Sequence, residues 1–238
     1  MKVGIMQPYF MPYIGYWQLM NAVDRYVIYD DVNYINRGWI HRNRILMNGA
    51  PIFFNVPMFG ASQNKLINEI KVNTDEALIV KNRRTIQTAY RKAPCYKTVY
   101  PILEAVLTCK KENIAEYIAE SFKIINAYLG IETELIMSST LKKDCSLRGQ
   151  DKVLAICEEL GATEYYNAIG GQELYSFSDF AARGIKLSFL KMDPIEYKQF
   201  GKEFQPNLSI IDVMMFNDRD EIRKMLTKFS LVTEKAEG

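Results

Sequence analysis

Short apolar runs and an amphipathic stretch open the chain. Residues 2–6 form a mainly apolar run of strand length, and residues 13–22 carry Tyr13, Tyr16 and Trp17 at helical spacing. Residues 25–29 form a second run of strand length. The pattern therefore predicts a strand, a loop, a helix and a second strand, an order that is typical of the start of a nucleotide-binding α/β fold.

A hairpin is predicted next. Residues 38–47 and 51–58 flank the dipeptide Asn48-Gly49. Asn-Gly is a strong hairpin signal because both turn positions require a positive φ.

Helical patterns then occupy residues 74–92 and 113–129, and we expect a shorter helix between them. Asn113 is a suitable N-cap for the last of these helices, and Gly130 is a suitable stop. These helices and the hairpin separate the first two strands from the rest of the sheet.

Beyond residue 130, strands and helices alternate. The pattern predicts strands at 133–137, 163–166 and 185–190, with helices at 149–160 and from Ser178 onward. Alternation at this spacing indicates parallel strands that are joined by helical crossovers.

Length and composition agree with one globular α/β domain. The chain has 238 residues, of which 48% are hydrophobic and 24% are charged, so a wholly disordered, collagen-like or disulfide-scaffold protein is excluded. We predict one Rossmann-like, nucleotidyltransferase-like α/β domain over residues 1–232, with a mainly parallel sheet. The β-hairpin and helical segment would be inserted at about 38–130, and residues 233–238 would be a flexible tail.

Charge and cysteine content limit the binding partners and the cellular compartment that we expect for the protein. Thirty Lys and Arg residues stand against 28 Asp and Glu, a balance that does not suit a dedicated nucleic-acid-binding protein. Residues 77–103 are basic without an acidic residue, which predicts either a solvated helix face or a funnel for a substrate phosphate. The four cysteines form no CxxC pair, and the first apolar run is too short for a signal peptide or a membrane span. We therefore expect a cytoplasmic protein with no membrane span and no nucleic-acid partner; no feature indicates the oligomeric state.

The single histidine limits the possible chemistry. With only His41, one chain cannot form a three-histidine zinc site or an HExxH helix. A Ser-His-Asp or Cys-His apparatus would have to use His41 itself. Carboxylates, arginines and tyrosines therefore carry most of the candidate chemistry.

The loop after the first strand is a candidate nucleotide-binding loop. In this position an α/β fold presents backbone N–H groups and a helix N-terminus to an anion. Residues 7–16 also resemble the FxPxHxGH loop of nucleotidyltransferases, although tyrosines stand near the positions of both histidines. The alternative is a purely structural aromatic loop. The candidate binding residues are Gln7, Tyr9, Tyr13, Gly15 and Tyr16.

The densest polar cluster follows the second strand. Asp30 and Asp31 could act as general base or hold a divalent cation, and with His41 they are the candidate catalytic residues. Arginines offer forked donors to a phosphate or carboxylate, and aromatic rings can stack on a base or a sugar. The alternative is a structural turn at Asp31 with solvated arginines on the outer face of the hairpin. The candidate binding residues of this cluster are Tyr34, Arg37, Trp39, Arg42 and Asn43.

A third candidate segment follows the strand at 163–166. Ligands of open α/β sheets bind beyond the carboxyl ends of the strands, and paired glycines let the backbone approach a ligand closely. A tight strand-to-helix turn would explain the same glycines. Later in the chain, Asp212 is expected either to pair structurally or to join the site. The candidate binding residues of the third segment are Asn167, Gly170, Gly171 and Tyr175.

Residues 6–45 resemble the opening signature of the WbqC-like protein family. The family is bacterial, and many members are encoded with genes for O-antigen, lipopolysaccharide and other surface polysaccharides. The resemblance therefore implies a role in sugar modification. His41 stands where an Asn is common in the family, which favours hydrogen bonding over proton transfer, and Asn36 stands where a Lys is common. The similarity continues through residues 62–65, 138–139, 149–151, 167–171, 174–175 and 208–212.

The resemblance and the candidate residues lead to one hypothesis. We expect an enzyme that modifies a UDP- or dTDP-linked amino sugar, most concretely a transferase that adds an acyl or aminoacyl group to the sugar amine. Asp30 or Asp31 would be the base or metal ligand, and Arg37, Arg42 and Lys65 would hold a phosphate or carboxylate. An ATP-dependent version, with ATP and Mg²⁺ as cofactors, would first activate a carboxylic acid.

Two alternatives remain open at this stage. A metal-dependent glycosyltransferase would use Asp30 and Asp31 as a metal-binding pair. A non-catalytic protein of the assembly machinery would bind a glycan or nucleotide sugar on its tyrosine side chains.

Overall fold

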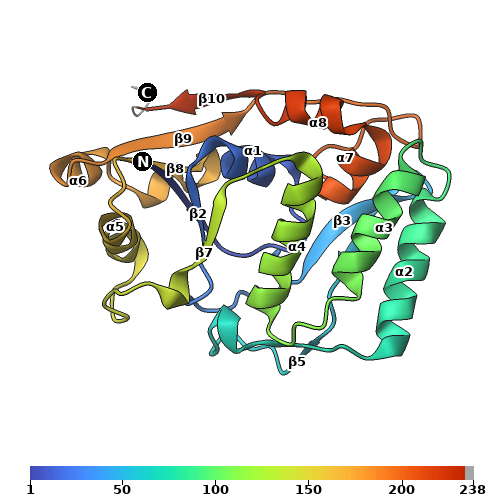
Figure 1. Cartoon of the computed structure of the whole chain (residues 1–238), viewed down its shortest axis with the longest axis horizontal. Coiled ribbons are helices and arrows are strands. Elements are labelled where there is room, and N and C mark those ends of the chain that lie inside the picture. The colour runs from blue at the N-terminus through green and yellow to red at the C-terminus, as the bar shows by residue number, and fades with distance from the viewer. Residues whose placement is uncertain (234–238) are drawn as a thin grey trace.

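A six-stranded, mainly parallel sheet forms the centre of the molecule (Figure 1). The computed structural model describes residues 1–233, so the predicted tail at 233–238 lies almost wholly outside the described residues. The strand order is β10-β9-β8-β1-β2-β7, and β10 is antiparallel to its neighbour while the others are parallel. The strands are β1 (Lys2–Met6), β2 (Arg25–Ile28), β7 (Glu134–Met137), β8 (Glu164–Ala168), β9 (Lys186–Met192) and β10 (Phe229–Val232).

The strand order places a topological switch point beside β1. The chain first moves from β1 to β2 and on to β7, and then crosses to the other side of β1 to add β8 and β9. Gly4 of β1 pairs with Tyr26 on one side and with Tyr166 on the other. In such doubly wound sheets, the crevice outside the carboxyl ends of the strands, where the order reverses, is the usual ligand site. The predicted mainly parallel sheet is confirmed, and its reversal points to the ends of β1 and β8.

Helices cover both faces of the sheet. The helices α5 (Gly149–Glu159) and α6 (Phe177–Ala182) pack on the face that carries Val3 and Ile5. Helix α1 (Ile14–Ala22) packs on the other face, where Gly4 would place a Cβ within 3.6 Å of Leu19. The two faces alternate along β1 as expected for a strand that is buried on both sides.

The inserted segment begins with the predicted hairpin. Strands β3 (Arg42–Met47) and β4 (Ala50–Asn55) pair around Asn48 and Gly49, both with positive φ. The strands are shorter than the expected arms, because residues 38–41 instead form a bend that is tied to the first loop by a hydrogen bond from Phe10 N–H to the carbonyl of Ile40. A second small pairing, β5 (Met58–Phe59) with β6 (Lys71–Val72), flanks the short helix η1 (Ile67–Glu69).

Three helices complete the insert. They are α2 (Glu76–Tyr90), α3 (Tyr96–Leu107) and α4 (Ile114–Leu129), and α2 and α3 lie at the opposite end of the molecule from α5 and α6 (Figure 1). As predicted, Asn113 caps α4 by accepting from two backbone N–H groups, and Gly130 ends it with a φ of 77°. Trp17 of α1 packs edge-on against Phe122 of α4, so the core on the α1 face continues into the insert.

The C-terminal part brings the chain back to the first loop. Residues 193–209 have no regular secondary structure, and α7 (Ile210–Phe216) and α8 (Arg219–Met225) follow them. Ser209 donates to the carbonyl of Met11, and the N–H of Ile210 donates to the carbonyl of Pro12. This segment therefore closes over the loop that leaves β1. Among the described residues, no helix has the length and apolar character to cross a membrane.

Candidate functional site at the switch point

A cavity of about 660 Å³ lies beyond the carboxyl ends of β1, β8 and β9. The loop after β1, the start of the hairpin and the chain following β8 and β9 all contribute to its wall, so it occupies the place that the strand order indicates. The lining residues are Met6, Tyr9, Pro12, Tyr13, Gly15, Tyr16, Trp39, Asn43, Arg44, Ala168, Ile169, Leu190, Lys191, Met192 and Asn207.

Three tyrosines of the first loop form one wall. Tyr9 stacks on Tyr16 with 5.1 Å between ring centroids, and Tyr13 meets Tyr16 edge-on. Tyr16 donates to the carbonyl of Gln7 over 2.8 Å. Gly15 leaves room for the Tyr13 ring, because an added Cβ would lie 2.4 Å from that ring and would force it to move. Burial raises the pKa of Tyr9, with a contribution from Tyr13, and burial raises the pKa of Tyr13 itself, so both stay protonated at neutral pH and serve as hydrogen-bond donors.

The hairpin supplies the opposite wall and one of two cations. Asn43 fixes this wall, because its amide donates to the carbonyl of Phe10 and its side-chain oxygen accepts the N–H of Arg44. The Arg44 guanidinium lies 5.9 Å from the Trp39 ring centroid. Its Nε is buried and has no hydrogen-bond partner in the described structure, which is costly unless a ligand supplies an acceptor.

The charge of the lining favours an anion. Arg44 and Lys191 line the cavity, whereas none of its lining residues, all within the described part of the chain, is Asp or Glu. Two cations without a competing carboxylate attract a phosphate or carboxylate group, and the tyrosine hydroxyls can add neutral donors.

A smaller cavity of about 390 Å³ adjoins the first one. The two share Tyr13, Met192 and Asn207 as wall residues. The rest of the smaller cavity is mostly apolar and is lined largely by the irregular segment 193–209; among the described residues that line it, only Glu196 is charged. The site therefore has a cationic chamber and an apolar chamber on either side of a common wall.

Asp212 anchors the segment that covers the smaller cavity. It is fully buried and accepts hydrogen bonds from Tyr90 of α2, from Tyr197 and from Gln199. Burial raises the pKa of Asp212, and the three hydrogen bonds oppose that shift. Of the two roles expected for Asp212, its contacts fit structural pairing.

Asp30 joins three segments of the backbone. The carboxylate is 1% exposed and accepts hydrogen bonds from Ser139 N–H over 2.9 Å, from Ser139 Oγ over 2.7 Å and from the Asn68 amide over 3.3 Å. Ser139 belongs to the short helix η2 (Ser138–Thr140) that follows β7. Because both oxygens are occupied by protein donors, Asp30 is placed to hold loops together and does not face the cavity.

Asp31 is held by two buried lysines. The Nζ atoms of Lys143 and Lys152 each lie 3.0 Å from its Oδ2, and both lysine side chains are at most 3% exposed. Burial acts to raise the pKa of Asp31, but the surrounding hydrogen-bond donors outweigh it and lower the pKa. Within residues 1–233, no three His, Cys, Asp or Glu side chains form a group that could hold a metal ion.

His41 and the predicted arginines lie outside the cavity wall. His41 Nδ1 is 2.7 Å from the hydroxyl of Tyr34, and burial, followed by the nearby Arg42, lowers the pKa of His41. Arg42 donates to the carbonyls of Gly38 and Arg37, so its guanidinium stabilises the bend before β3. Arg37 and Lys65 are exposed, and the carbonyl of Lys65 accepts the N–H of Tyr34.

The residues after β8 form a packed turn. Asn167 donates to the hydroxyl of Tyr165, and a Cβ at Gly171 would lie 2.8 Å from the Asn167 side-chain oxygen. Gly170 has open space around it. Tyr175 packs edge-on against Tyr165, 5.6 Å between centroids. Glycine at 171 is thus explained by packing, in line with the turn interpretation.

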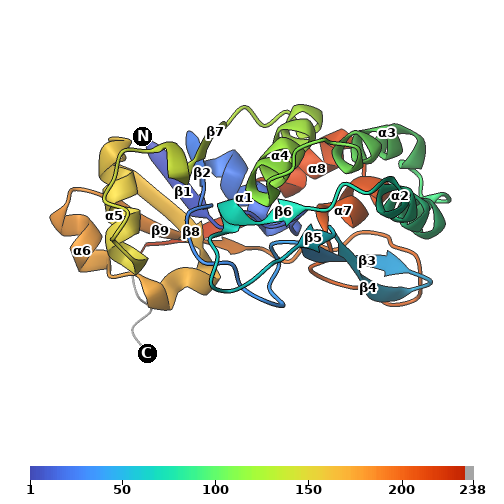
Figure 2. The same ribbon diagram turned by 90° about the horizontal axis from the view of Figure 1, so that it is seen from below.

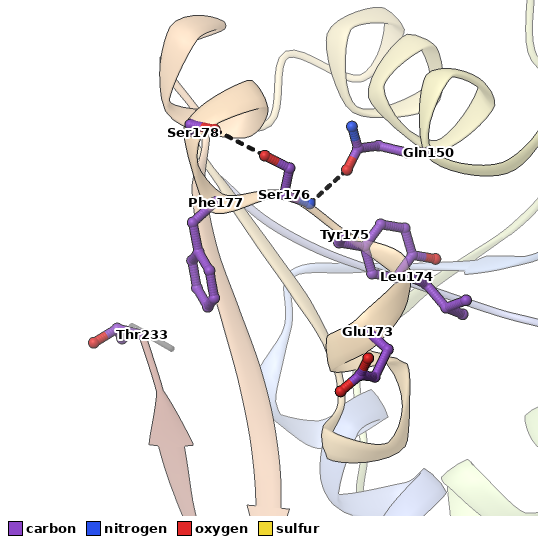
Figure 3. Close-up of a pocket in the computed structure, with 8 residues that line it drawn as sticks. All are labelled: Gln150, Glu173, Leu174, Tyr175, Ser176, Phe177, Ser178 and Thr233. Carbon is purple, nitrogen blue, oxygen red and sulfur yellow. Dashed lines mark hydrogen bonds between the residues drawn. The ribbon is translucent and has the colours of Figure 1, made fainter. Parts of the chain in front are cut away.

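Tyr175 also lines a hollow on the α5–α6 face (Figure 3). This hollow has about 690 Å³, and two hydrogen bonds in its wall, from Ser176 N–H to Gln150 and between Ser176 and Ser178, are already made. Its lining includes Glu173 and, within the described residues, no Lys or Arg. The hollow therefore suits an anionic ligand less well than the switch-point cavity does.

The predicted site residues thus fall into two groups: some line the switch-point cavity and the others lie outside its wall. Arg44, one of the arginines expected to offer forked donors, also lines the cavity, whereas Lys191 and Asn207 were not predicted; the position of Lys191 at the carboxyl end of a predicted strand was the available signal. Those that the fold brings together at the cavity are Tyr9, Tyr13, Gly15, Tyr16, Trp39 and Asn43.

Comparison with known proteins agrees with the resemblance in the sequence. An uncharacterised protein of Mycobacterium tuberculosis (strain ATCC 25618 / H37Rv), Rv1507c, is 27% identical over 220 residues, which cover 91% of this chain and 93% of that protein. No solved structure matches. The sequence model of the WbqC-like protein family matches residues 7–224, a span that includes every lining residue of the cavity except Met6. The chain therefore belongs to the WbqC-like protein family.

Proposed function

We propose that the protein binds a nucleotide-linked amino sugar in the switch-point cavity and transfers an acyl or aminoacyl group to the sugar amine. Membership of the WbqC-like family suggests a polysaccharide-related function. The observation that carries the proposal is the cavity itself, which lies at the reversal of the strand order and has Arg44 and Lys191 in its wall without a carboxylate.

The lining matches the parts of a nucleotide-linked sugar. Arg44, with its unpartnered Nε, would pair with the diphosphate, because a guanidinium binds phosphate through directed hydrogen bonds. Trp39 offers a ring face for a base or a sugar, and the protonated hydroxyls of Tyr9 and Tyr13 would donate to hydroxyl or phosphate oxygens. UDP- and dTDP-linked sugars share this chemistry.

The adjoining apolar cavity supports acyl transfer over other modifications. It would hold the acyl part of the donor on the far side of Tyr13, Met192 and Asn207, so that the two substrates meet at the common wall. The sugar amine attacks the carbonyl carbon of the donor, a C–N bond forms, and the bond from that carbon to its leaving group breaks while the proton of the amine leaves to water. The lining residues then act by holding and orienting both substrates.

An ATP-dependent version would use the same chamber. Arg44 and Lys191 fit the phosphates of ATP, and ATP would supply the activation of a carboxylic acid. Within residues 1–233, none of the lining residues has a carboxylate for Mg²⁺, so the phosphates of ATP would have to bind that ion.

The contacts of Asp30 and Asp31 give less support to a metal-dependent glycosyltransferase. Three of the four carboxylate oxygens that would bind the metal ion already contact Ser139, Asn68, Lys143 or Lys152, and the fourth, Oδ1 of Asp31, has no partner in the described part of the chain. A non-catalytic nucleotide-sugar-binding protein would use the same cavity, so turnover is what separates it from the transferase.

Two measurements test the proposal. The first is a thermal-shift comparison of UDP, dTDP and ATP, since a ligand at a hundred times its Kd adds about 2.7 kcal/mol of apparent stability. The second is mass detection of a dTDP- or UDP-linked 4-amino-dideoxysugar after incubation with acetyl-coenzyme A, or with amino acids and ATP. We expect a nucleotide-dependent shift and a mass gain of one acyl or aminoacyl group. Nucleotide binding without a mass change for any donor would indicate a non-catalytic binding protein. No thermal shift with any nucleotide would refute the proposal that the cavity binds a nucleotide.

A further inference from the structure

The inserted hairpin and the bend that precedes it expose large apolar side chains to solvent. Ile35 is 48% exposed, Trp39 is 39% exposed and Phe53 is 51% exposed. The rings of Trp39 and Phe53 lie 6.2 Å apart, and Ile35 contacts the bend at Gly38, one residue before Trp39. We call these three side chains, together with Arg37, Arg42 and Arg44, the hairpin patch.

The charge of this segment is one-sided. Residues 32–68 contain four Lys or Arg residues and no Asp or Glu, although the whole chain carries a formal net charge of only +2. The two acidic residues just before this stretch, Asp30 and Asp31, are engaged by their own donors inside the protein. The surface made by this segment is therefore cationic as well as apolar.

Two of the arginines are held against the aromatic rings. The Arg42 guanidinium lies 4.4 Å from the centroid of Phe53 and donates to the carbonyl of Gly38 over 3.0 Å. The Arg44 guanidinium lies 5.9 Å from the centroid of Trp39. Because the cations and the rings share one surface, a partner that contacts the rings also meets the positive charges.

The patch lies at the edge of the molecule and borders the cavity. Hairpin β3–β4 is peripheral, with α2, α3 and α4 on one side of it (Figure 2). Trp39 and Arg44 line the switch-point cavity, whereas Ile35, Arg37 and Phe53 do not. The exposed rings are thus continuous with the cavity wall.

We propose that the hairpin patch docks on the surface of an anionic phospholipid bilayer, with the cavity wall beside the membrane. Aromatic rings such as Trp39 are favoured at the boundary between headgroups and acyl chains, and arginines bind the phosphates of anionic headgroups. The combination of inserted apolar side chains and cationic attraction gives stable attachment where either alone is marginal. Docking would place the cavity next to membrane-anchored acceptors or carriers. The docking proposal rests on the hairpin patch and does not depend on the transferase reaction.

Vesicle co-sedimentation of the full chain tests the docking. We expect binding to phosphatidylcholine vesicles that contain phosphatidylglycerol, little binding to pure phosphatidylcholine, and release as the salt concentration rises. Phe53→Ser and Ile35→Ser should each weaken the binding, and Arg37→Ser should weaken it about fivefold, the effect of one basic residue near an anionic surface. None of these three residues lines the cavity, so UDP affinity should stay unchanged.

A matched control comes from another exposed apolar residue. Leu174, in the short helix η3 (Ile169–Leu174), is 69% exposed, and Leu174→Ser removes an even more exposed apolar side chain outside the patch. Vesicle binding by this variant should equal that of the unmodified protein. The docking proposal is refuted if the unmodified protein does not bind the anionic vesicles, if Leu174→Ser loses as much binding as Phe53→Ser, or if Phe53→Ser and Arg37→Ser bind as well as the original chain.

Discussion

Two polar clusters lie at the carboxyl edge of the same sheet, and they differ in whether their charged side chains have counter-ions. Around Asp30 and Asp31, after β2, Ser139 donates to Asp30, and Lys143 and Lys152 pair with Oδ2 of Asp31, whereas Oδ1 of Asp31 has no hydrogen-bond partner in the described structure. Around the switch point, after β1 and β8, the cation Arg44 keeps a buried Nε without a partner. The first cluster closes the end of β2 and β7, whereas the second leaves donors for a ligand.

The difference shows what distinguishes a site from a structural network. Both clusters combine charges with aromatic rings, and the acidic pair is the denser of the two in the sequence. A buried charge that is paired with counter-ions of the protein needs no ligand. A buried donor without a partner beside a cavity is stabilised when a ligand supplies an acceptor. The position of a group relative to the reversal of strand order is thus more informative than local residue density.

The largest effect, on the free energy of unfolding, is expected in the cluster around Asp31. Asp31→Ala would leave the buried ammonium groups of Lys143 and Lys152 without a carboxylate, and should lower the free energy of unfolding by about 3–5 kcal/mol in urea titrations. Lys143→Met is the matched control, because it leaves one ammonium for one carboxylate and should cost clearly less. A larger loss for Lys143→Met than for Asp31→Ala would contradict the view that Asp31 is the hub of this cluster.

A smaller effect, on binding and not on stability, is expected at the cavity. Arg44→Met should weaken the binding of UDP about 30-fold in titration calorimetry, or about 2 kcal/mol, because a partly buried charge pair with phosphate is lost. The control is Arg42→Met, since the Arg42 guanidinium is engaged with the carbonyls of Gly38 and Arg37. Equal losses in the two variants would show that the cavity is not where the nucleotide binds.

The smallest effect is a pH dependence that involves neither cluster directly. The pKa of His41 is lowered in the folded protein from its ordinary value of 6.5, first by burial and then by Arg42. The unfolded chain therefore binds a proton more readily, and the free energy of unfolding should fall as the pH drops through 6.5 toward the folded-state pKa. Because His41 is the single histidine, one imidazole signal in an NMR titration reports its pKa. A folded-state pKa above 6.5 would be inconsistent with this account, and His41→Asn should remove the slope.

Much of the fold could be predicted from local patterns. The parallel strands and long helices were predicted to within a few residues, because apolar runs, helical spacing and caps such as Asn113 act over short stretches. The C-terminal helices α7 and α8 were missed: α7 is short and apolar around its circumference, with six of its seven residues buried, so it shows no amphipathic period. Strands β5 and β6 have two residues each and are set by their tertiary pairing.

The site was predictable only where it is local. Tyr9, Tyr13 and Tyr16 follow the first strand directly, so their place at a strand end could be inferred. Lys191 lies at a strand end as well, but its place in the same cavity depends on β9 lying two strands from β1, and Asn207 reaches the cavity through the irregular segment 193–209; no local pattern reveals either arrangement. The contact between Asp31 and Lys152 likewise spans 121 residues of sequence, so the counter-ions of the acidic pair could not be read from the residues around it.

The central place of β1 has a consequence for how the protein folds. One edge of β1 pairs with β2, which follows it in the sequence after a single helix. The other edge pairs with β8, and the contact between Met1 and Thr163 there spans 162 residues of sequence. Non-local pairing of this kind slows folding, and an unpaired strand edge invites association with other chains until its partner arrives. The switch-point cavity cannot exist before β8 and β9 have joined β1, so a ligand stabilises the completed sheet and cannot assist the earlier steps of its assembly.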